Sequence, residues 1–250
     1  MRSTQWNDAV SVIDRVTIVL GCFRADDKRL GVSELARRAN LPKSTVSRLV
    51  SELVEHRYLE RDGTGVRLGL RLFELGELAA QPRALRTLAL ATMADLRDAT
   101  GHTVHLAVLE GVEVVYVGVI RARNAPAARA RLGGRLPAYS TAVGRALLAH
   151  AGPDVVANVI DDGLRRAGSS DGAGGIADRA AVYAQLDRVR ATGLAYEPEG
   201  TAPTCAASAI VSAGGEAVAA ISACARAGEF DVATVGPAVR TAALALGRSI

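Results

Sequence analysis

The sequence contains few cysteines and few aromatic residues, and its hydrophobic stretches are interrupted. The three cysteines, Cys22, Cys205 and Cys224, lie far apart and form no CxxC pair, which predicts a reduced, cytosolic protein without a disulfide framework or a zinc site. Aromatic residues make up only 4% of the chain, so alanine, valine and leucine must fill the core. The N-terminal residues show no apolar run that ends in a cleavage site, and we therefore expect no signal peptide.

Motifs for membrane insertion, phosphate binding, metal binding and catalysis are also lacking. The most hydrophobic stretch, residues 205–225, contains Glu216 and two adjacent glycines, which is typical of two strands and a turn. No GxxxxGK[ST] phosphate loop occurs. His102 and His105 do not share a strand face and have no suitably spaced acidic partner, and Cys205 has no identifiable base. We therefore expect no catalytic residue, no metal site and no cofactor.

The length of 250 residues suits one large domain or two ordinary ones, and we expect a boundary at Gln81-Pro82. A net charge of +4 mildly favours an acidic partner. In the first part, helices are expected at residues 11–23, 33–40 (with Ser33 as N-cap), 43–56 and 70–80, and a hairpin around the turn at 62–65. This order predicts a first domain at residues 1–69 and a linker helix at 70–82.

Residues 83–250 show β-rich segments between helical ones. Strands are expected at 103–109, 112–120, 194–197, 205–212 and 217–225. Helices are expected at 83–100, 141–151, 153–161, 177–192 and 231–248, with an arginine-rich loop at 122–137 and a flexible loop at 169–175. The second domain is therefore predicted to be α+β around an antiparallel sheet.

Residues 43–56 combine a polar N-terminal end with an apolar stripe. The stripe follows helical spacing and consists of Val46, Leu49, Val50, Leu53 and Val54. A helix N-terminus carries unpaired N–H groups and a partial positive charge, so its polar end favours phosphate. Short hydroxyl side chains allow close approach to a groove, and Arg48 can reach a base edge or a phosphate. Two helices joined by a short turn and followed by a hairpin predict a winged helix-turn-helix.

Basic residues concentrate around this helix. Residues 28–48 contain six basic and one acidic side chain, a net charge of +5, whereas residues 1–82 contain 13 and 11, a net charge of only +2. A phosphate-binding surface requires such a concentration, although an ordinary amphipathic helix with a solvated polar face is the alternative. The candidate DNA-contacting residues are Lys43, Ser44, Thr45, Ser47 and Arg48 on the helix, Arg38 before it, and Arg61 and Arg67 on the hairpin.

The chain resembles the IclR family of bacterial transcription regulators over about residues 10–248. The resemblance is carried by LPKST at residues 41–45, by the wing and RLG that follow, by RLPAYSTAVGRALLA at 135–149, and by residues 193–224. It implies a winged helix-turn-helix, a linker helix, and a C-terminal GAF-like domain whose antiparallel sheet is flanked by helices and lies beside a ligand cavity.

The resemblance also implies positions for effector contacts. These are the backbone donors of Ala142 and Val143, the carboxylate of Glu197, where aspartate is usual, and the side chains of Cys205, Ser222 and Cys224. Such donors would hold a carboxylate-like group in a small polar cavity. The segment after Glu197 is shortened and contains Pro198, and Ser208 replaces a usual proline, so ligand size and class stay open. Arg121 or Arg123 is a further candidate partner for an anion, although a solvated loop or a subunit contact is the favoured reading.

We therefore expect an effector-responsive transcription regulator, more readily a repressor than an activator, of a metabolic or catabolic operon. Its ligand would be a small organic acid or aromatic compound. The protein would be cytoplasmic, have no membrane partner, and bind a pseudo-palindromic operator in double-stranded DNA as a homodimer or homotetramer. The alternatives are a small-molecule-binding enzyme with an accessory DNA-binding domain, which turnover would reveal, and an architectural DNA-binding protein whose second domain only oligomerises.

Overall fold

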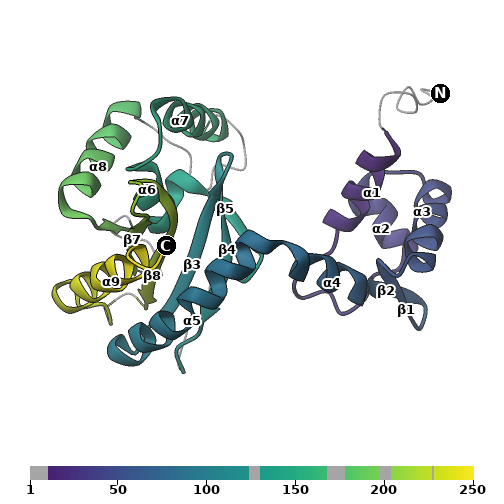
Figure 1. The fold of residues 1–250 in the computed structure, drawn as a ribbon. Coiled ribbons are helices and arrows are strands. Elements are labelled where there is room, and N and C mark those ends of the chain that lie inside the picture. The colour runs from purple at the N-terminus through teal and green to yellow at the C-terminus, as the bar shows by residue number, and fades with distance from the viewer. Residues whose placement is uncertain (1–10, 124–129, 168–177, 198–203, 227) are drawn as a thin grey trace. The chain divides into compact units, whose positions relative to one another are not determined.

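The computed structural model describes residues 11–123, 130–167, 178–197, 204–226 and 228–250. The chain divides into two compact units, Met1–Arg83 and Ala84–Ile250 (Figure 1). The first unit contains one hydrophobic cluster and the second contains two, one on each face of its sheet.

The first unit consists of three short helices, a two-stranded hairpin and a fourth helix (Figure 1). In chain order these are α1 (Val12–Gly21), α2 (Val32–Ala39), α3 (Lys43–Glu55), β1 (Leu59–Asp62), β2 (Gly65–Leu68) and α4 (Leu70–Leu78). The strands pair antiparallel, and a bridge between Leu30 and Val66 attaches the hairpin to the segment before α2. The predicted winged helix-turn-helix is confirmed.

The turn between α2 and α3 depends on two residues with suitable backbone preferences. Asn40 ends α2 in the left-handed conformation, with φ 51°, which asparagine tolerates better than most residues. Pro42 then precedes α3, where its missing N–H removes no helical hydrogen bond. The prediction of Ser33 as N-cap is wrong, because α2 already begins at Val32 and Ser33 lies within its first turn.

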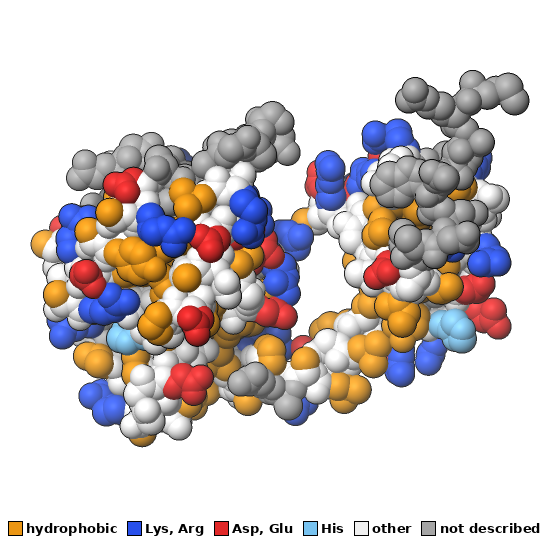
Figure 2. All heavy atoms as spheres, turned by 90° about the horizontal axis from the view of Figure 1, so that it is seen from above, with side chains coloured by type: hydrophobic (Ala, Val, Ile, Leu, Met, Phe, Trp, Pro, Cys, Tyr) orange, Lys and Arg blue, Asp and Glu red, His pale blue; other side chains and the backbone are white. Residues whose placement is uncertain are grey.

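Helix α3 buries the predicted stripe, whereas α4 buries no side chain. Val46, Leu49, Val50 and Leu53 are buried, and Val54 is partly buried against the same cluster. On α4 the side chains of Leu70, Phe73 and Leu78 are 62%, 64% and 73% exposed. Figure 2 shows hydrophobic side chains at the surface of the segment that connects the two units. Within the described part of the chain, α4 therefore leaves these three apolar side chains largely exposed.

The second unit is a six-stranded antiparallel sheet with helices on both faces (Figure 1). Its elements are α5 (Ala80–Thr100), whose first turn still belongs to the first unit, β3 (Thr103–Glu110), β4 (Glu113–Ile120), β5 (Arg135–Pro137), the 3-10 turn η1 (Ala138–Ser140), α6 (Ala142–Leu148), α7 (Pro153–Ala167), α8 (Arg179–Thr192), β6 (Ala195–Tyr196), β7 (Thr204–Val211), β8 (Ala217–Ala225) and α9 (Val232–Gly247). The strand order is β5-β4-β3-β8-β7-β6. Helices α5 and α9 cover one face, and α6, α7 and α8 cover the other. The predicted α+β class is confirmed.

Some boundaries differ from the predictions. Strand β5 lies within residues expected to be a loop and extends the sheet beyond β4. Helix α5 begins at Ala80 and contains Pro82 in its first turn. The backbone N–H that proline lacks would have no acceptor within the helix at this position, so the helix tolerates it. Helix α7 continues to Ala167. The predicted loop at 169–175 and much of the arginine-rich loop lie outside the described residues.

The hydrophobic stretch at residues 205–225 forms most of β7 and β8 with a turn between them, as its sequence predicts. Among the residues that the structure describes, no helix has both the length and the apolar character needed to cross a membrane. The same residues contain no cluster of three or more histidine, cysteine or acidic side chains that could bind a metal.

Candidate functional sites

The N-terminal end of α3 is exposed on the first unit. Among the residues that the structure describes, no side chain caps its first backbone N–H groups, and its first turn contains no acidic residue. The side chains predicted to contact DNA on this helix are exposed at Lys43, Ser44, Ser47 and Arg48 and half-buried at Thr45. The end of α3 therefore combines available donors, a positive partial charge and short polar side chains, which together suit a phosphate backbone.

Arg48 is available for a partner outside the protein. Its side chain is 70% exposed, and its Nε atom lies 3.8 Å from Oε1 of Glu52, which is itself 55% exposed. An exposed ion pair of this kind contributes about 0–1 kcal/mol. The Arg48 guanidinium can therefore exchange Glu52 for a phosphate or a base edge at little cost.

Arg38 is held inside the first unit. Its guanidinium donates to both carboxylate oxygens of Asp27, to Glu34 and to the carbonyl of Cys22, and only 18% of its side chain is exposed. Hydrogen bonds from Arg37 and Arg38 lower the pKa of the Glu34 carboxyl to about 2. The structure thus gives Arg38 internal partners in place of the DNA contact that its sequence position suggests.

The two arginines of the hairpin differ in their surroundings. Arg61 is exposed on β1. Arg67 on β2 donates to Glu60 through Nε at 3.1 Å and Nη2 at 3.0 Å, and Glu60 also accepts from the backbone N–H of Leu70. Glu60 therefore joins the hairpin to the start of α4, and Arg67 would have to release Glu60 to contact a phosphate fully.

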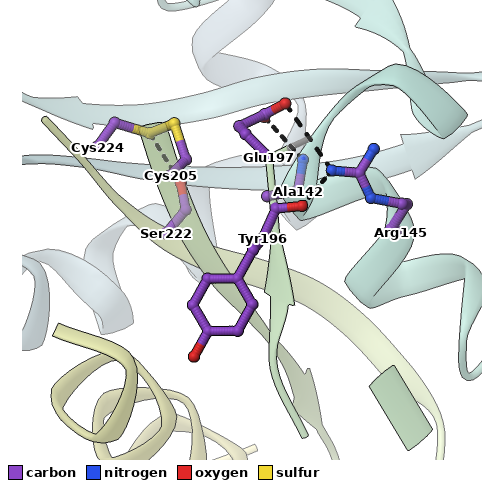
Figure 3. Close-up of a disulfide and its surroundings, with 7 residues drawn as sticks. All are labelled: Ala142, Arg145, Tyr196, Glu197, Cys205, Ser222 and Cys224. Carbon is purple, nitrogen blue, oxygen red and sulfur yellow. Dashed lines mark hydrogen bonds and ion pairs between the residues drawn. A yellow bond between two sulfur atoms is a disulfide. The ribbon is translucent and has the colours of Figure 1, made fainter. Parts of the chain in front are cut away.

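In the second unit, the predicted effector residues meet at the sheet face that α6 covers (Figure 3). Antiparallel pairing places Cys205 on β7 opposite Cys224 on β8, and the N–H of Glu197 donates to the carbonyl of Cys205 at 2.9 Å. Ser222 lies two residues along β8 from Cys224 and therefore on the same face. The sheet register thus assembles residues from three neighbouring strand segments into one site.

Glu197 already uses one of the backbone donors assigned to the effector. Its Oε1 accepts from the N–H of Ala142 at 2.9 Å (Figure 3), and the Thr141 hydroxyl accepts from the N–H of Gly144 at 3.0 Å. Two of the first three amides of α6 are therefore bonded within the protein. An effector carboxylate at Ala142 would have to displace Glu197 or approach beside it.

Arg145 provides a buried positive charge next to Glu197. Its guanidinium donates to the carbonyls of Tyr139 and Tyr196, and its Nη2 atom lies 3.8 Å from Oε2 of Glu197. Burial lowers the pKa of Arg145, while the negative charge of Glu197 opposes this shift. Because an isolated charge would be costly in this site, the positive charge of Arg145 offsets the negative charge of the Glu197 carboxylate.

A close approach of α6 to η1 depends on Gly144. A Cβ atom at this position would lie 1.9 Å from the carbonyl oxygen of Ala138. The first turn of α6 can therefore pack against η1 only with glycine here, and this packing holds Ala142 and Val143, both almost fully buried, at the site.

The expectation of a protein without disulfides is wrong. Cys205 and Cys224 are joined by a disulfide bond, with their Cα atoms 4.2 Å apart. The physical reason is the register of β7 and β8, which places residues 19 positions apart in sequence directly opposite each other. The Oγ atom of Ser222 lies 3.9 Å from the Cys224 sulfur (Figure 3). The third cysteine, Cys22, is free.

Two residues of this region were not assigned a role from the sequence. Arg145 is the one charged residue in the otherwise apolar run of α6, AVGRALL, and this contrast is the feature of the sequence that could have indicated a role for it. His105 lies opposite Ser222 on β3 and is 2% exposed, and neither ring nitrogen has a hydrogen-bond partner within the described part of the chain. The rings of His105 and Tyr116 pack in a T-shaped arrangement, with their centroids 5.5 Å apart. Burial, with the Arg121 charge, lowers the pKa of His105 to about 4.

A pocket of about 550 Å³ lies at the end of the sheet near the disulfide. It is lined by the end of α5, the start of β3 and the end of β8, and includes Thr103, Cys224 and the arginines Arg97, Arg123 and Arg226. Cys224 therefore lies both at the effector site and at an opening whose wall also contains two acidic residues, Asp98 and Glu229, the first paired with Arg97 at 2.7 Å.

These features define a class of protein. A winged helix-turn-helix joined to an α+β unit with a small polar site is the architecture of a DNA-binding regulator that senses a ligand. Residues 12–63 match the IclR helix-turn-helix domain, and residues 78–248 match the domain described as bacterial transcriptional regulator IclR C-terminal. The chain belongs to the IclR family of bacterial transcriptional regulators.

Individual relatives agree with this assignment. The chain is 29% identical to the transcriptional regulator XynR of Escherichia coli over 76% of its own length and 75% of the relative's. It is 31% identical to the E. coli regulator KdgR over 77% and 72%. An IclR homologue from Microbacterium hydrocarbonoxydans, solved in complex with 4-hydroxybenzoate, is 34% identical, with a TM-score of 0.83 over 95% of this chain and 98% of that one. The protein is thus a transcriptional regulator with a DNA-binding and an effector domain.

Proposed function

We propose that this regulator represses a metabolic or catabolic operon and that a small carboxylate, either an organic acid or an aromatic acid, alters its affinity for the operator. The observation that carries the DNA-binding part is the exposed, uncapped N-terminal end of α3 with Lys43, Ser44, Ser47 and Arg48 around it. In this proposal α3 enters the major groove, and Arg61 and Arg67 on the hairpin contact the phosphate backbone.

The effector part rests on the buried polar groups of the second unit. Arg145 supplies a positive charge, Ala142 and Val143 lie at the start of α6, and Ser222 supplies a hydroxyl. The 34% identical homologue was crystallised with 4-hydroxybenzoate, which carries a carboxylate and a hydroxyl group. An effector of the same class would satisfy the buried charge and hydrogen-bonding groups here, with Glu197 releasing the N–H of Ala142.

We further propose that the protein acts as a homodimer or homotetramer in the cytoplasm. The exposed apolar side chains of α4 support oligomerisation, because contiguous exposed apolar surface is typical of an interface. A symmetric dimer would place two α3 helices in successive major grooves of a pseudo-palindrome. Helix α4 would then couple the two functions, with a coupling free energy of about 1–3 kcal/mol.

The test begins with selection of bound sequences from a random DNA library by the full-length protein. A pseudo-palindromic site is expected, and failure to enrich any site would overturn the regulator mechanism. Thermal unfolding with and without 4-hydroxybenzoate then tests the ligand class. Ser222→Ala and Glu197→Ala should each retain affinity for the selected site while losing its response to the ligand, and a retained response would overturn the assignment of these residues.

A further inference from the structure

The disulfide lies within the proposed effector site and uses two of the six residues assigned to it. Cys205 and Cys224 contribute their sulfur atoms to one face of the sheet, beside Ser222 and next to Glu197 (Figure 3). A disulfide sulfur carries no proton, whereas a thiol is a weak donor. The oxidised pair therefore offers a ligand no S–H group and holds the two sulfurs together at the surface that the ligand would contact.

The fold does not depend on this bond to bring β7 and β8 together. The strands pair along their whole length, from Thr204 opposite Ala225 to Val211 opposite Ala217, and both belong to a six-stranded sheet with helices on both faces. Backbone hydrogen bonds and the alanine-rich packing remain when the S–S bond is broken. Reduction can therefore change the site without dismantling the domain.

The bond is accessible from one side. Cys224 lines the pocket of about 550 Å³ at the end of the sheet, whose wall also contains Arg97, Arg123 and Arg226. A small thiol fits in such a volume. Arg97 is paired with Asp98 at 2.7 Å, and Glu229 also lies in the wall, so Arg123 and Arg226 leave a small excess of positive charge for an anionic thiolate. The two cysteines are almost equally buried, Cys205 at 6% and Cys224 at 8% exposed, but Cys224 belongs to the pocket wall, so attack at its sulfur makes Cys205 the leaving group.

We propose that Cys205 and Cys224 are a reversible redox pair that switches the effector site between a disulfide form that binds the effector weakly and a dithiol form that binds it tightly. The inference rests on the proposed function for the location of the effector, but the chemistry of the pair does not. A low-molecular-weight dithiol is the reductant, and a peroxide is the oxidant.

The electron balance involves two electrons in each direction. A thiolate of the reductant attacks the Cys224 sulfur, the S–S bond breaks, and Cys205 leaves as a thiolate that takes up a proton. The second thiol of the reductant then displaces Cys224 and becomes part of a cyclic disulfide. In the reverse direction a peroxide oxidises one cysteine to a sulfenic acid, releasing water or an alcohol, and the other cysteine displaces a second water to form the disulfide.

The first experiment counts thiols on the native, full-length protein in a Cys22→Ser background, by maleimide labelling and intact mass. No label is expected after mild hydrogen peroxide, two labels after dithiothreitol, and none after a second peroxide treatment. A disulfide that dithiothreitol leaves intact without denaturant would overturn the proposal, and so would two free thiols that persist after peroxide. Circular dichroism after each step verifies that the fold is retained.

The second experiment measures the affinity for 4-hydroxybenzoate in both forms by calorimetry. The dithiol form is expected to bind about ten-fold more tightly, the effect of one recovered hydrogen bond to a charged group. Equal affinities would overturn the switch. Cys224→Ser keeps the Cys205 thiol but cannot form the disulfide, so its affinity should not respond to either reagent, whereas Cys22→Ser should respond as the wild type does.

The two experiments separate the failure of this inference from that of the proposed function. If 4-hydroxybenzoate binds neither form, the proposed ligand class is wrong for this protein. In that case the switch is tested by comparing the affinity for the selected DNA site after dithiothreitol with the affinity after peroxide. Equal DNA affinities and no ligand response would overturn regulation by the pair, whatever the thiol count shows.

Discussion

The two candidate sites are built in opposite ways. In the first unit the proposed DNA contacts come mostly from the first two turns of α3 and are exposed. In the second unit the proposed effector contacts come from α6, the end of β6, β7 and β8, and most of them are buried. A DNA groove is approached from outside, whereas a small effector is recognised by enclosure. Substitutions in the first site should therefore change binding alone, and substitutions in the second should change binding and stability together.

The largest expected effect is on Arg145. Arg145→Met should lower the free energy of unfolding of the second unit by about 3–5 kcal/mol, because it leaves the partly buried Glu197 carboxylate without its positive partner and the carbonyls of Tyr139 and Tyr196 without their donor. The measurement is urea unfolding followed by hydrogen exchange of the β7 and β8 amides. Arg165→Met is the matched control, since Arg165 is 70% exposed, and its effect should be small. Equal stabilities of the Arg145 and Arg165 variants would contradict the role of the buried pair.

The second prediction concerns pH and His105. Because the fold lowers the pKa of His105 from 6.5 to about 4, its contribution to stability is fully present above pH 6.5 and is lost as the pH falls through this range. The lost stability should reach about 3 kcal/mol at the acid end. His105→Phe should have a flatter profile of unfolding free energy between pH 7 and 4 than the wild type. A substitution of the exposed His56 to Phe is the control, and identical profiles for wild type and His105→Phe would exclude this effect.

A smaller effect is expected at Arg48, which belongs to the proposed DNA-contact site of the first unit. Arg48→Ala should weaken binding to the selected DNA site by about 1–3 kcal/mol if Arg48 reads a base edge. Its unfolding free energy should stay close to that of the wild type, because the side chain is exposed. Arg48→Lys separates two roles, since lysine restores a phosphate contact but not a bidentate base contact. Arg188→Ala on α8 is the control, and an unchanged gel shift for Arg48→Ala would exclude the contact.

The smallest effect is expected at Lys43. Lys43→Gln should weaken binding to all DNA sequences alike and reduce the slope of log K against log salt by about 1, because one phosphate contact and its counterion release are lost. Titrations at several salt concentrations, by fluorescence anisotropy, measure this slope. Arg188→Gln should leave the slope unchanged. A slope for Lys43→Gln equal to that of the wild type would place Lys43 away from the phosphates.

The parts that sequence reasoning predicted well are local. The apolar stripe of α3, the following hairpin, and the strands β3, β4, β7 and β8 all appear near their expected residues, since their patterns repeat every 3.6 or 2 positions. Strand β5 was missed, because three residues beside an arginine-rich segment give no periodic signal. The resemblance to the IclR family indicated the cysteine and serine positions on β7 and β8, but spacing in sequence could not show which sulfur atoms meet.

The sequence by itself determined the order of helices and strands, the two-part organisation, and the polar N-terminal end of α3, because hydrophobic periodicity and local charge act between residues close in the chain. Only the tertiary structure decided that Cys205 bonds to Cys224, that Glu197 accepts from Ala142, and that Arg38 binds Asp27 within the domain. These outcomes depend on strand register and on the packing of separate elements, where a shift of one residue would turn each side chain to the opposite face.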